Sequence, residues 1–304
     1  MFGLVSALSW GIGDFAGGLA SRFGSVALAM LVSQTFGAVT AMAALRWSTE
    51  VLPPNEALFW AAAAGLAGIG GLACFYRALS GGSMALIAPL AGLIGAAVPA
   101  AVAIVGGEQV SPLRSIGLVT ALLAIVLISV PRGTRGSATR VLIGREALLA
   151  TAGGLGFAAF FLFLDRSAAT GGEAWWPLLV VRLVGLAAVI AAVVVLSAVS
   201  RGGKARRRPA DLLGLNRLRL SAQSAGWLTI APVFLLAGAG DMGGNVFFLF
   251  ANRHDTLAVA AVLSSLYPIV TALLAAAFLH ERLGSAQIVG VALAVAAAAL
   301  IGVG

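Results

Sequence analysis

Two acidic residues lie in stretches of the sequence that are otherwise suited to lipid. Asp14 is the only charged residue between Phe2 and Ala20, and Asp241 is the only one in the apolar stretch 227–251. A carboxylate at the centre of a membrane helix costs about 3 kcal/mol, so it should face a cavity or a partner rather than lipid. We expect either that one of these carboxylates exchanges a proton or binds an amine, or that both are structural groups paired across helices.

Other chemically capable residues accompany the carboxylates. Trp10 shares a helix face with Asp14, where it could form an apolar wall of a cavity, and Asn245 follows Asp241 by one turn. Arg182 lies near the start of a later apolar stretch. Its guanidinium either reaches inward to an acid or to a ligand carboxylate, or extends to the nearer membrane interface. We favour the interface.

The stretch SSLYPIV predicts a broken helix in the second half of the chain. Pro268 has no N–H and leaves a backbone carbonyl without its helical partner, which is tolerated only where the carbonyl is satisfied internally or lines a cavity. Pro89 and Pro99 predict similar breaks in an earlier segment. These prolines mark either a binding and gating region or packing kinks without ligand contact. The binding candidates beside Pro268 are Ser264, Ser265 and Tyr267.

The remaining candidates carry weaker signals. Tyr76 and Gln34 could line the same cavity, although an aromatic residue at helical spacing is more often a packing residue. Glu108 and Glu281 lie at helix junctions, where a carboxylate stabilises a helix N-terminus, so we interpret both as structural. The chain has one cysteine, and its two histidines lack metal-ligand spacing. We therefore predict no disulfide within the chain, no metal site and no cofactor.

Composition places these residues in an integral membrane protein. Hydrophobic residues make up 61% and charged residues 10% of the 304 residues, whereas a soluble domain is about half apolar and about a quarter charged. The net charge of +8 comes mostly from two connecting loops, which indicates cytoplasmic anchors rather than nucleic-acid binding. The first apolar stretch is not followed by a secretory cleavage pattern, so we expect it to remain in the protein.

Ten apolar stretches are long enough to cross a bilayer as helices, which takes roughly 20 residues each. They show no sustained alternation and are too long for barrel strands. The predicted helices are 2–20, 27–46, 57–79, 84–105, 113–131, 146–165, 176–199, 227–251, 256–279 and 284–303. Two basic loops, 132–145 and 200–226, interrupt them. The second half of the later loop is either an amphipathic helix on the membrane surface or a solvated linker, and we favour the linker.

The second half of the chain repeats the first. Residues 65–129 align without a gap on residues 238–302, and the Gly, Phe and Glu matches carry the repeat. These matches are Gly65 with Gly238, Gly70 with Gly243, Gly71 with Gly244, Phe75 with Phe248, Glu108 with Glu281 and Gly117 with Gly290. Because each unit has an odd number of helices, the second unit enters the membrane inverted, which is typical of secondary transporters. The predicted units are 1–131 and 146–304, joined by the loop 132–145.

Three motifs carry a family resemblance. They are SALSWGIGDFAGGLASR in the first helix, LAVAAVLSSLYPIVTALLAAAFLHERLGSAQIVGVALAVAAAALIG in the last two, and its weaker first-half copy MALIAPLAGLIGAAVPAAVAIVGGEQVSPLRSIG. In them the chain resembles the ten-helix EamA-type members of the drug/metabolite transporter superfamily. The resemblance implies two inverted five-helix repeats around a central cavity, and export or exchange of small metabolites, often amino acids. It also implies cytoplasmic termini, whereas the distribution of Lys and Arg places both termini outside.

These features predict a secondary active transporter that moves amine-bearing or amino-acid-like solutes by alternating access. The expected location is the cell membrane, as a multi-pass protein of a bacterial inner membrane, with lipid, the solute and protons as partners. A passive channel on the same fold is one alternative. A polytopic membrane enzyme is another, but HExxH and GxSxG motifs are absent. We therefore predict no enzymatic activity and no catalytic residues.

Overall fold

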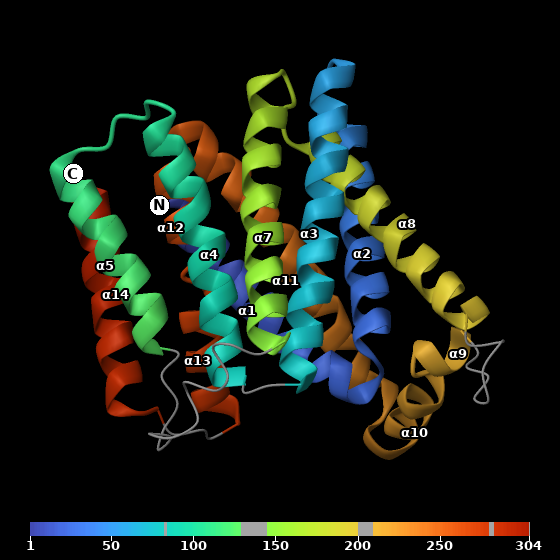
Figure 1. Cartoon of the computed structure of the whole chain (residues 1–304). Coiled ribbons are helices and arrows are strands. Elements are labelled where there is room, and N and C mark those ends of the chain that lie inside the picture. The colour runs from blue at the N-terminus through green and yellow to red at the C-terminus, as the bar shows by residue number, and fades with distance from the viewer. Residues whose placement is uncertain (82–83, 129–144, 200–208, 280–282, 304) are drawn as a thin grey trace.

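The computed structural model describes residues 1–81, 84–128, 145–199, 209–279 and 283–303. Throughout these ranges the regular structure is α-helical, as the sequence predicts (Figure 1). Glu281 lies outside the described residues, as does nearly all of the basic loop 132–145, and so do the side chains of Tyr76 and Pro89.

Each of the ten predicted stretches lies on a helix, and the stretch 256–279 is divided into two. Two further short helices, α9 and α10, lie between the long helices of the second half. The helices are α1 (Phe2–Phe23), α2 (Val26–Trp47), α3 (Asn55–Gly81), α4 (Met84–Val105), α5 (Pro112–Ile128), α7 (Arg145–Ala169), α8 (Trp175–Val199), α9 (Pro209–Leu212), α10 (Leu215–Ala225), α11 (Trp227–His254), α12 (Leu257–Ser264), α13 (Tyr267–Phe278) and α14 (Ser285–Val303).

The predicted break at Pro268 is present, and the one at Pro99 is not. α12 ends at Ser264, and Pro268 lies in the first turn of α13, where an N–H would have no helical partner in any case. By contrast, α4 continues through Pro99, whose ring is fully buried. Its backbone is also helical at residue 89. Packing against neighbouring helices accommodates a proline without a break, so the predictions for α4 are wrong.

Close helix packing ties the two halves of the chain together. Among the described helices, the most extensive contacts are those of α3 with α7 and of α1 with α11. A Cβ on Gly240 of α11 would lie 2.5 Å from the Cα of Gly13 in α1, and a Cβ on Gly156 of α7 would lie 2.5 Å from the Cα of Gly71 in α3. Only glycine lets two helix backbones approach this closely. The contact between Gly240 and Gly13 fixes the relative positions of α1 and α11, the helices that carry Asp14 and Asp241.

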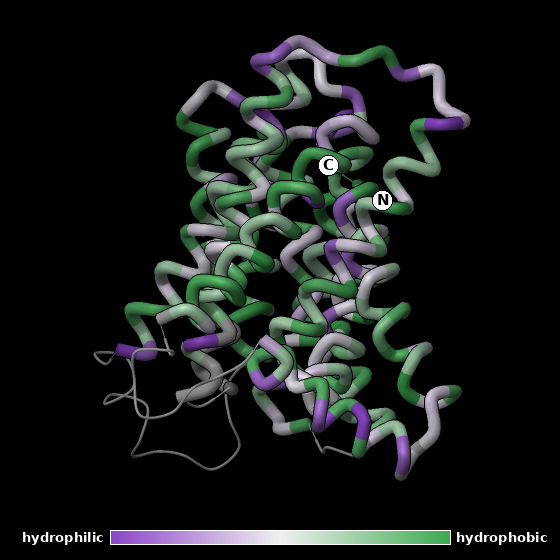
Figure 2. Tube along the Cα trace, turned by 90° about the vertical axis from the view of Figure 1, so that its right-hand side faces the viewer, coloured by the Kyte–Doolittle hydropathy of each residue, from purple (hydrophilic) through white to green (hydrophobic). Residues whose placement is uncertain are grey.

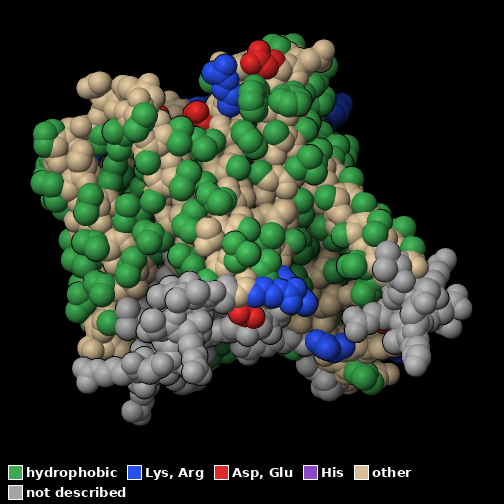
Figure 3. All heavy atoms as spheres, in the orientation of Figure 1, with side chains coloured by type: hydrophobic (Ala, Val, Ile, Leu, Met, Phe, Trp, Pro, Cys, Tyr) green, Lys and Arg blue, Asp and Glu red, His purple; other side chains and the backbone are tan. Residues whose placement is uncertain are grey.

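The surface is that of a membrane protein. Hydrophobic residues follow the helices over most of their length (Figure 2), and they cover the outer face between two ends where charged side chains gather (Figure 3). Leu66, Leu148 and Val195 are among the exposed apolar side chains. In the described part of the chain, seven segments are long and apolar enough to cross a membrane. Such a continuous apolar surface would favour aggregation in water but suits lipid.

Residues 215–225 form a helix where the sequence favours a solvated linker. Leu218 and Ala222 of α10 belong to an apolar cluster that also includes Phe234 of α11. Ser221 Oγ donates a hydrogen bond of 3.3 Å to the carbonyl of Phe23 at the end of α1. The linker interpretation is therefore wrong, because the apolar face of this short segment packs on the protein. A position on the membrane surface stays a prediction.

Candidate functional site

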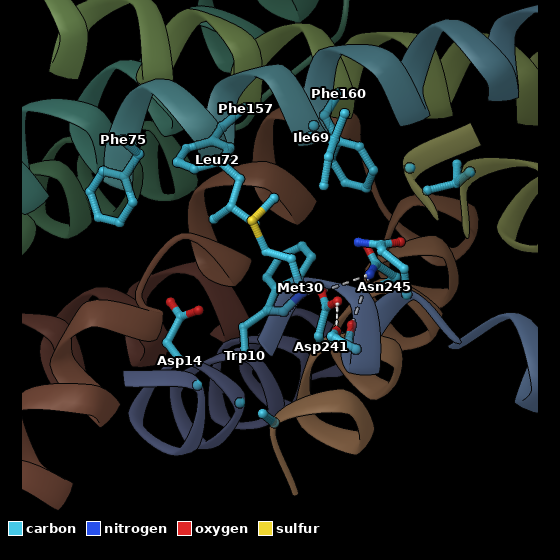
Figure 4. Close-up of a pocket in the computed structure, with 18 of the residues that line it drawn as sticks. Trp10, Asp14, Met30, Ile69, Leu72, Phe75, Phe157, Phe160, Asp241 and Asn245 are labelled. Carbon is cyan, nitrogen blue, oxygen red and sulfur yellow. Dashed lines mark hydrogen bonds between the residues drawn. The ribbon is translucent and has the colours of Figure 1, made fainter. Parts of the chain in front are cut away.

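A cavity of about 180 Å³ lies between helices of the two halves (Figure 4). Its walls come from α1, α2, α3 and α4 in the first half and from α7, α8 and α11 in the second, together with the break between α12 and α13. The cavity is therefore at the place where the inverted repeat predicts a site. The predicted site residues on its lining are Trp10, Asp14, Arg182, Asp241, Asn245, Ser265 and Tyr267.

Asp241 is the centre of a polar network on one side of this cavity. Its Oδ2 atom lies 2.5 Å from Nη1 of Arg182 and accepts a hydrogen bond of 2.7 Å from Ser33 Oγ. Asn245 Nδ2 donates to Oδ1 of the same carboxylate at 3.3 Å and to the Asp241 carbonyl at 2.8 Å. Arg182 Nη1 also donates to Gln34 Oε1 at 3.4 Å. The ion pair thus joins α8 to α11, and hydrogen bonds from Ser33 and to Gln34 attach α2 to it.

The position of Arg182 corrects the sequence interpretation. We favoured a side chain that extends to the membrane interface, but its side chain is only 3% exposed and it pairs with Asp241. Among the described residues, its Nε and Nη2 atoms have no hydrogen-bond partner. The physical reason is local: α2 has a glycine, Gly37, at the point where the stem of Arg182 crosses it. This space depends on the contact between α2 and α8, so the sequence of either helix alone does not predict it.

Asp14 differs from Asp241 in having no partner in the described part of the chain. It lines the cavity from α1, its side chain is exposed, and Figure 4 shows its carboxylate directed into the cavity on the side of Phe75. Among the described residues, nothing donates a hydrogen bond to it or forms an ion pair with it. An unpaired carboxylate in a membrane protein is a functional-site hypothesis by default.

Aromatic rings form the apolar part of the cavity. Trp10 packs in a cluster with Phe161, Phe248 and Tyr267, at ring-centroid distances of 5.6, 6.2 and 6.3 Å. The predicted wall at Trp10 is therefore present. On the opposite side, rings from α3 and α7 line the cavity, among them Phe157 (Figure 4). The cavity combines a carboxylate that has no described partner with a mostly apolar lining that includes several aromatic rings.

Residues 207–303 match the model of the EamA-like transporter family. The match covers the last third of the chain. The match includes the motif of α12, α13 and α14, and it confirms the resemblance to EamA-type members of the drug/metabolite transporter superfamily. Together with the apolar helices, the match indicates a membrane protein, and it is compatible with the prediction of no enzymatic activity.

A solved structure shares the fold of this chain. That structure, named only "Crystal structure of protein", superposes with a TM-score of 0.64, and the likeness covers 98% of each chain at 18% sequence identity. At this identity the likeness shows a common fold and nothing about substrate. No curated protein matches the chain at a significant level.

Two of the predicted polar residues, Glu108 and Ser264, lie away from the cavity lining, as do Pro99 and Pro268. Glu108 accepts hydrogen bonds from the backbone N–H groups of Leu257 at 2.9 Å and Ala258 at 3.1 Å. It therefore caps α12, a helix of the other half, rather than the helix that follows it. Ser264 is fully buried at the end of α12, and its hydroxyl has no partner among the described residues.

Part of the lining was not predicted from the sequence. Met30 and Ser33 of α2 and Phe160 of α7 contribute to the cavity, and Ser33 holds the central carboxylate. The available signal was the polar pair Ser33 and Gln34 within an apolar stretch, of which we considered only Gln34.

Replacing Gly37 by alanine is expected to displace Arg182 from Asp241. The added Cβ would lie 2.6 Å from Arg182 Nε, and overpacking of this kind costs about 1–3 kcal/mol. The measurement is the free energy of unfolding in detergent. Gly18→Ala in α1 is the matched control, because a Cβ there meets nothing within 4 Å; it should leave stability unchanged or raise it by about 0.5–1 kcal/mol. Equal stability of the two variants would contradict the close fit at Gly37.

Proposed function

We propose that this chain is a secondary active transporter that exports or exchanges small amine-bearing or amino-acid-like metabolites by alternating access. One observation carries the proposal: the carboxylate of Asp14, unpaired among the described residues, faces a cavity that helices of both halves enclose. Substrate sites of inverted-repeat transporters lie at this interface. The EamA match over residues 207–303 supports transport as the general activity.

The packing of the helices supports two inverted five-helix repeats, 1–131 and 146–304, with ten membrane spans. The most extensive contacts between the halves have counterparts when the halves are exchanged. α3 packs on α7 as α11 packs on α1, and α4 packs on α7 as α12 and α13 pack on α1. The contact of α3 with α8 likewise corresponds to that of α11 with α2. Such equivalence is expected of a structure built from two related units.

The two ends of the cavity differ, as alternating access requires. At one end Ser21 and Val26, beside the turn between α1 and α2, belong to the lining. At the opposite end the halves are tied by polar contacts. Arg114 Nη1 lies 2.8 Å from Asp255 Oδ1, Glu108 caps α12, and Glu50 accepts hydrogen bonds from the first N–H groups of α8. This arrangement supports a state that is open only toward the first end.

The open end is also the basic end. α5 and α8 end there, and the stretches of sequence that follow them, 129–145 and 200–226, contain 11 of the 19 Lys and Arg residues. By the positive-inside rule this end faces the cytoplasm and both termini face outward. The proposed location is the cell membrane of a bacterium. Asp14 is the proposed site of proton coupling, because no described partner competes for its carboxylate.

The proposal is tested by measuring solute uptake into vesicles and its acceleration by the same solute on the opposite side of the membrane. The solute is first identified by comparing metabolites inside and outside cells that express the chain or an empty vector. With purified protein in sealed vesicles, uptake should saturate and should accelerate when unlabelled solute is loaded on the other side. Linear uptake without such acceleration would favour the channel, and no solute movement at all would contradict transport.

A further inference from the structure

We infer that Asp241 holds Arg182 as an internal counter-ion, so that the cavity selects singly charged amines with an apolar body over zwitterions and anions. This inference rests on the proposed function, because it names the substrate class of the proposed transport site. It starts from the charges on the cavity lining. The charged side chains there, within the described part of the chain, are Asp14, Asp241 and Arg182.

Arg182 is not free to receive a carboxylate ligand. Its Nη1 atom contacts Asp241 and donates to Gln34, and its side chain is only 3% exposed. The two donors without described partners, Nε and Nη2, are themselves buried, and Nε lies against Gly37 of α2. A ligand carboxylate would have to displace Asp241 from the guanidinium first. Asp241 is 34% exposed, but losing it would leave the buried Arg182 cation without its carboxylate partner, which is unfavourable.

The charge that remains available is that of Asp14. With Asp241 and Arg182 neutralising each other, the described lining has a net charge of one negative unit. Phe75, Phe157 and Phe160 face Asp14 and Trp10 across the cavity (Figure 4). Aromatic faces attract cations and pack on apolar groups. The same surroundings would repel an anion, since the described lining offers it no free positive charge.

Only the ammonium group of an amino acid finds a partner in this cavity. Its ammonium group could bind Asp14, but its carboxylate would then lie in a cavity whose described lining holds a second acid and no free cation. A carboxylate left without a partner in such surroundings reduces affinity. Asp241 is therefore a specificity-determining residue: it decides whether Arg182 is available.

Three probes with the same phenyl group test the selection by charge. Phenethylamine is a cation, phenylalanine adds a carboxylate to it, and phenylacetate is an anion. Equilibrium binding to purified protein should favour phenethylamine over phenylalanine by about tenfold or more, and phenylacetate should not bind. Asp241→Asn, which frees Arg182, should reverse or abolish this preference, and phenylalanine should raise the unfolding temperature of that variant.

A second variant distinguishes an effect of the cavity charge on binding from an effect of misfolding. Arg182→Gln combined with Asp241→Asn removes both charges, keeps the cavity at one negative unit and should restore the preference for phenethylamine over phenylalanine. Equal or tighter binding of phenylalanine by the wild type would overturn the inference, as would an unchanged preference in Asp241→Asn or the absence of binding by all three probes. If phenethylamine binds selectively but is never transported, the transport proposal fails while the selection by charge stands.

Discussion

Replacement of Asp14 by asparagine is expected to reduce the rate of solute transport by about a hundredfold, with little change in stability. The carboxylate faces the cavity and has no hydrogen bond or ion pair to the described residues, so its removal leaves none of them unsatisfied. Loss of the charge removes the group to which a substrate amine, or a coupled proton, would bind. Initial rates of uptake into reconstituted vesicles measure the effect, together with the unfolding temperature of the purified variant.

A matched substitution distinguishes this role from a general effect of losing a carboxylate. Asp165 of α7 accepts a hydrogen bond of 2.8 Å from Asn252 Nδ2, and it does not line the cavity. Asp165→Asn should therefore retain most of the transport rate. Asp14→Glu, which keeps the charge, should retain part of it. Full transport by Asp14→Asn would show that Asp14 neither binds substrate nor couples protons.

Removal of Arg182 is expected to have the largest effect on stability. Arg182→Met leaves Asp241 without its cation among Ser33 and Asn245. Arg182 is 3% exposed but Asp241 is 34% exposed, so the cost should lie below the roughly 3–5 kcal/mol of a fully buried pair. Combining Arg182→Met with Asp241→Leu should recover most of this loss, because a pair of apolar side chains can replace a buried ion pair at little cost. The free energy of unfolding in detergent, measured with denaturant, distinguishes the single from the double variant.

The chain offers a partly exposed ion pair as the control. The side chains of Arg114 and Asp255 are 30% and 28% exposed, and their charged atoms lie 2.8 Å apart. Arg114→Met should cost only about 1 kcal/mol or less, because solvent screens such a pair. If Arg114→Met destabilised the protein as much as Arg182→Met, or if the double variant recovered nothing, the central pair would not be the stabilising contact described above.

Features that depend on a single segment could be predicted from the sequence. The apolar stretches lie on helices, the helix breaks ahead of Pro268, and Trp10 and Asp14 line one cavity as their spacing indicates. Each of these follows from length, from the chemistry of one residue or from the helical period. The two acids were also correctly expected to face a cavity or a partner. The sequence did not show that Asp241 pairs with Arg182 while Asp14 has no partner among the described residues.

Features that depend on the relative positions of distant helices could not be predicted from the sequence. Arg182 pairs with Asp241 because Gly37 leaves room for its stem, and no property of the apolar stretch 176–199 shows this. Glu108 was correctly interpreted as structural, yet the helix that it caps begins at Leu257 in the other half. The second half of the loop 200–226 was interpreted as a solvated linker, whereas it contains the helix α10, whose apolar face packs on the protein.

Access to the cavity from both sides of the membrane is the most direct test of alternating access. The chain has one cysteine, Cys74, so Cys74→Ser combined with Met30→Cys places a single thiol on the cavity wall. In sealed vesicles of known orientation, a membrane-impermeant thiol reagent should label this position from the basic end in the resting protein. During transport it should also label from the opposite end, and the transported solute should protect the thiol. Labelling from one end alone under every condition would contradict alternating access through this cavity.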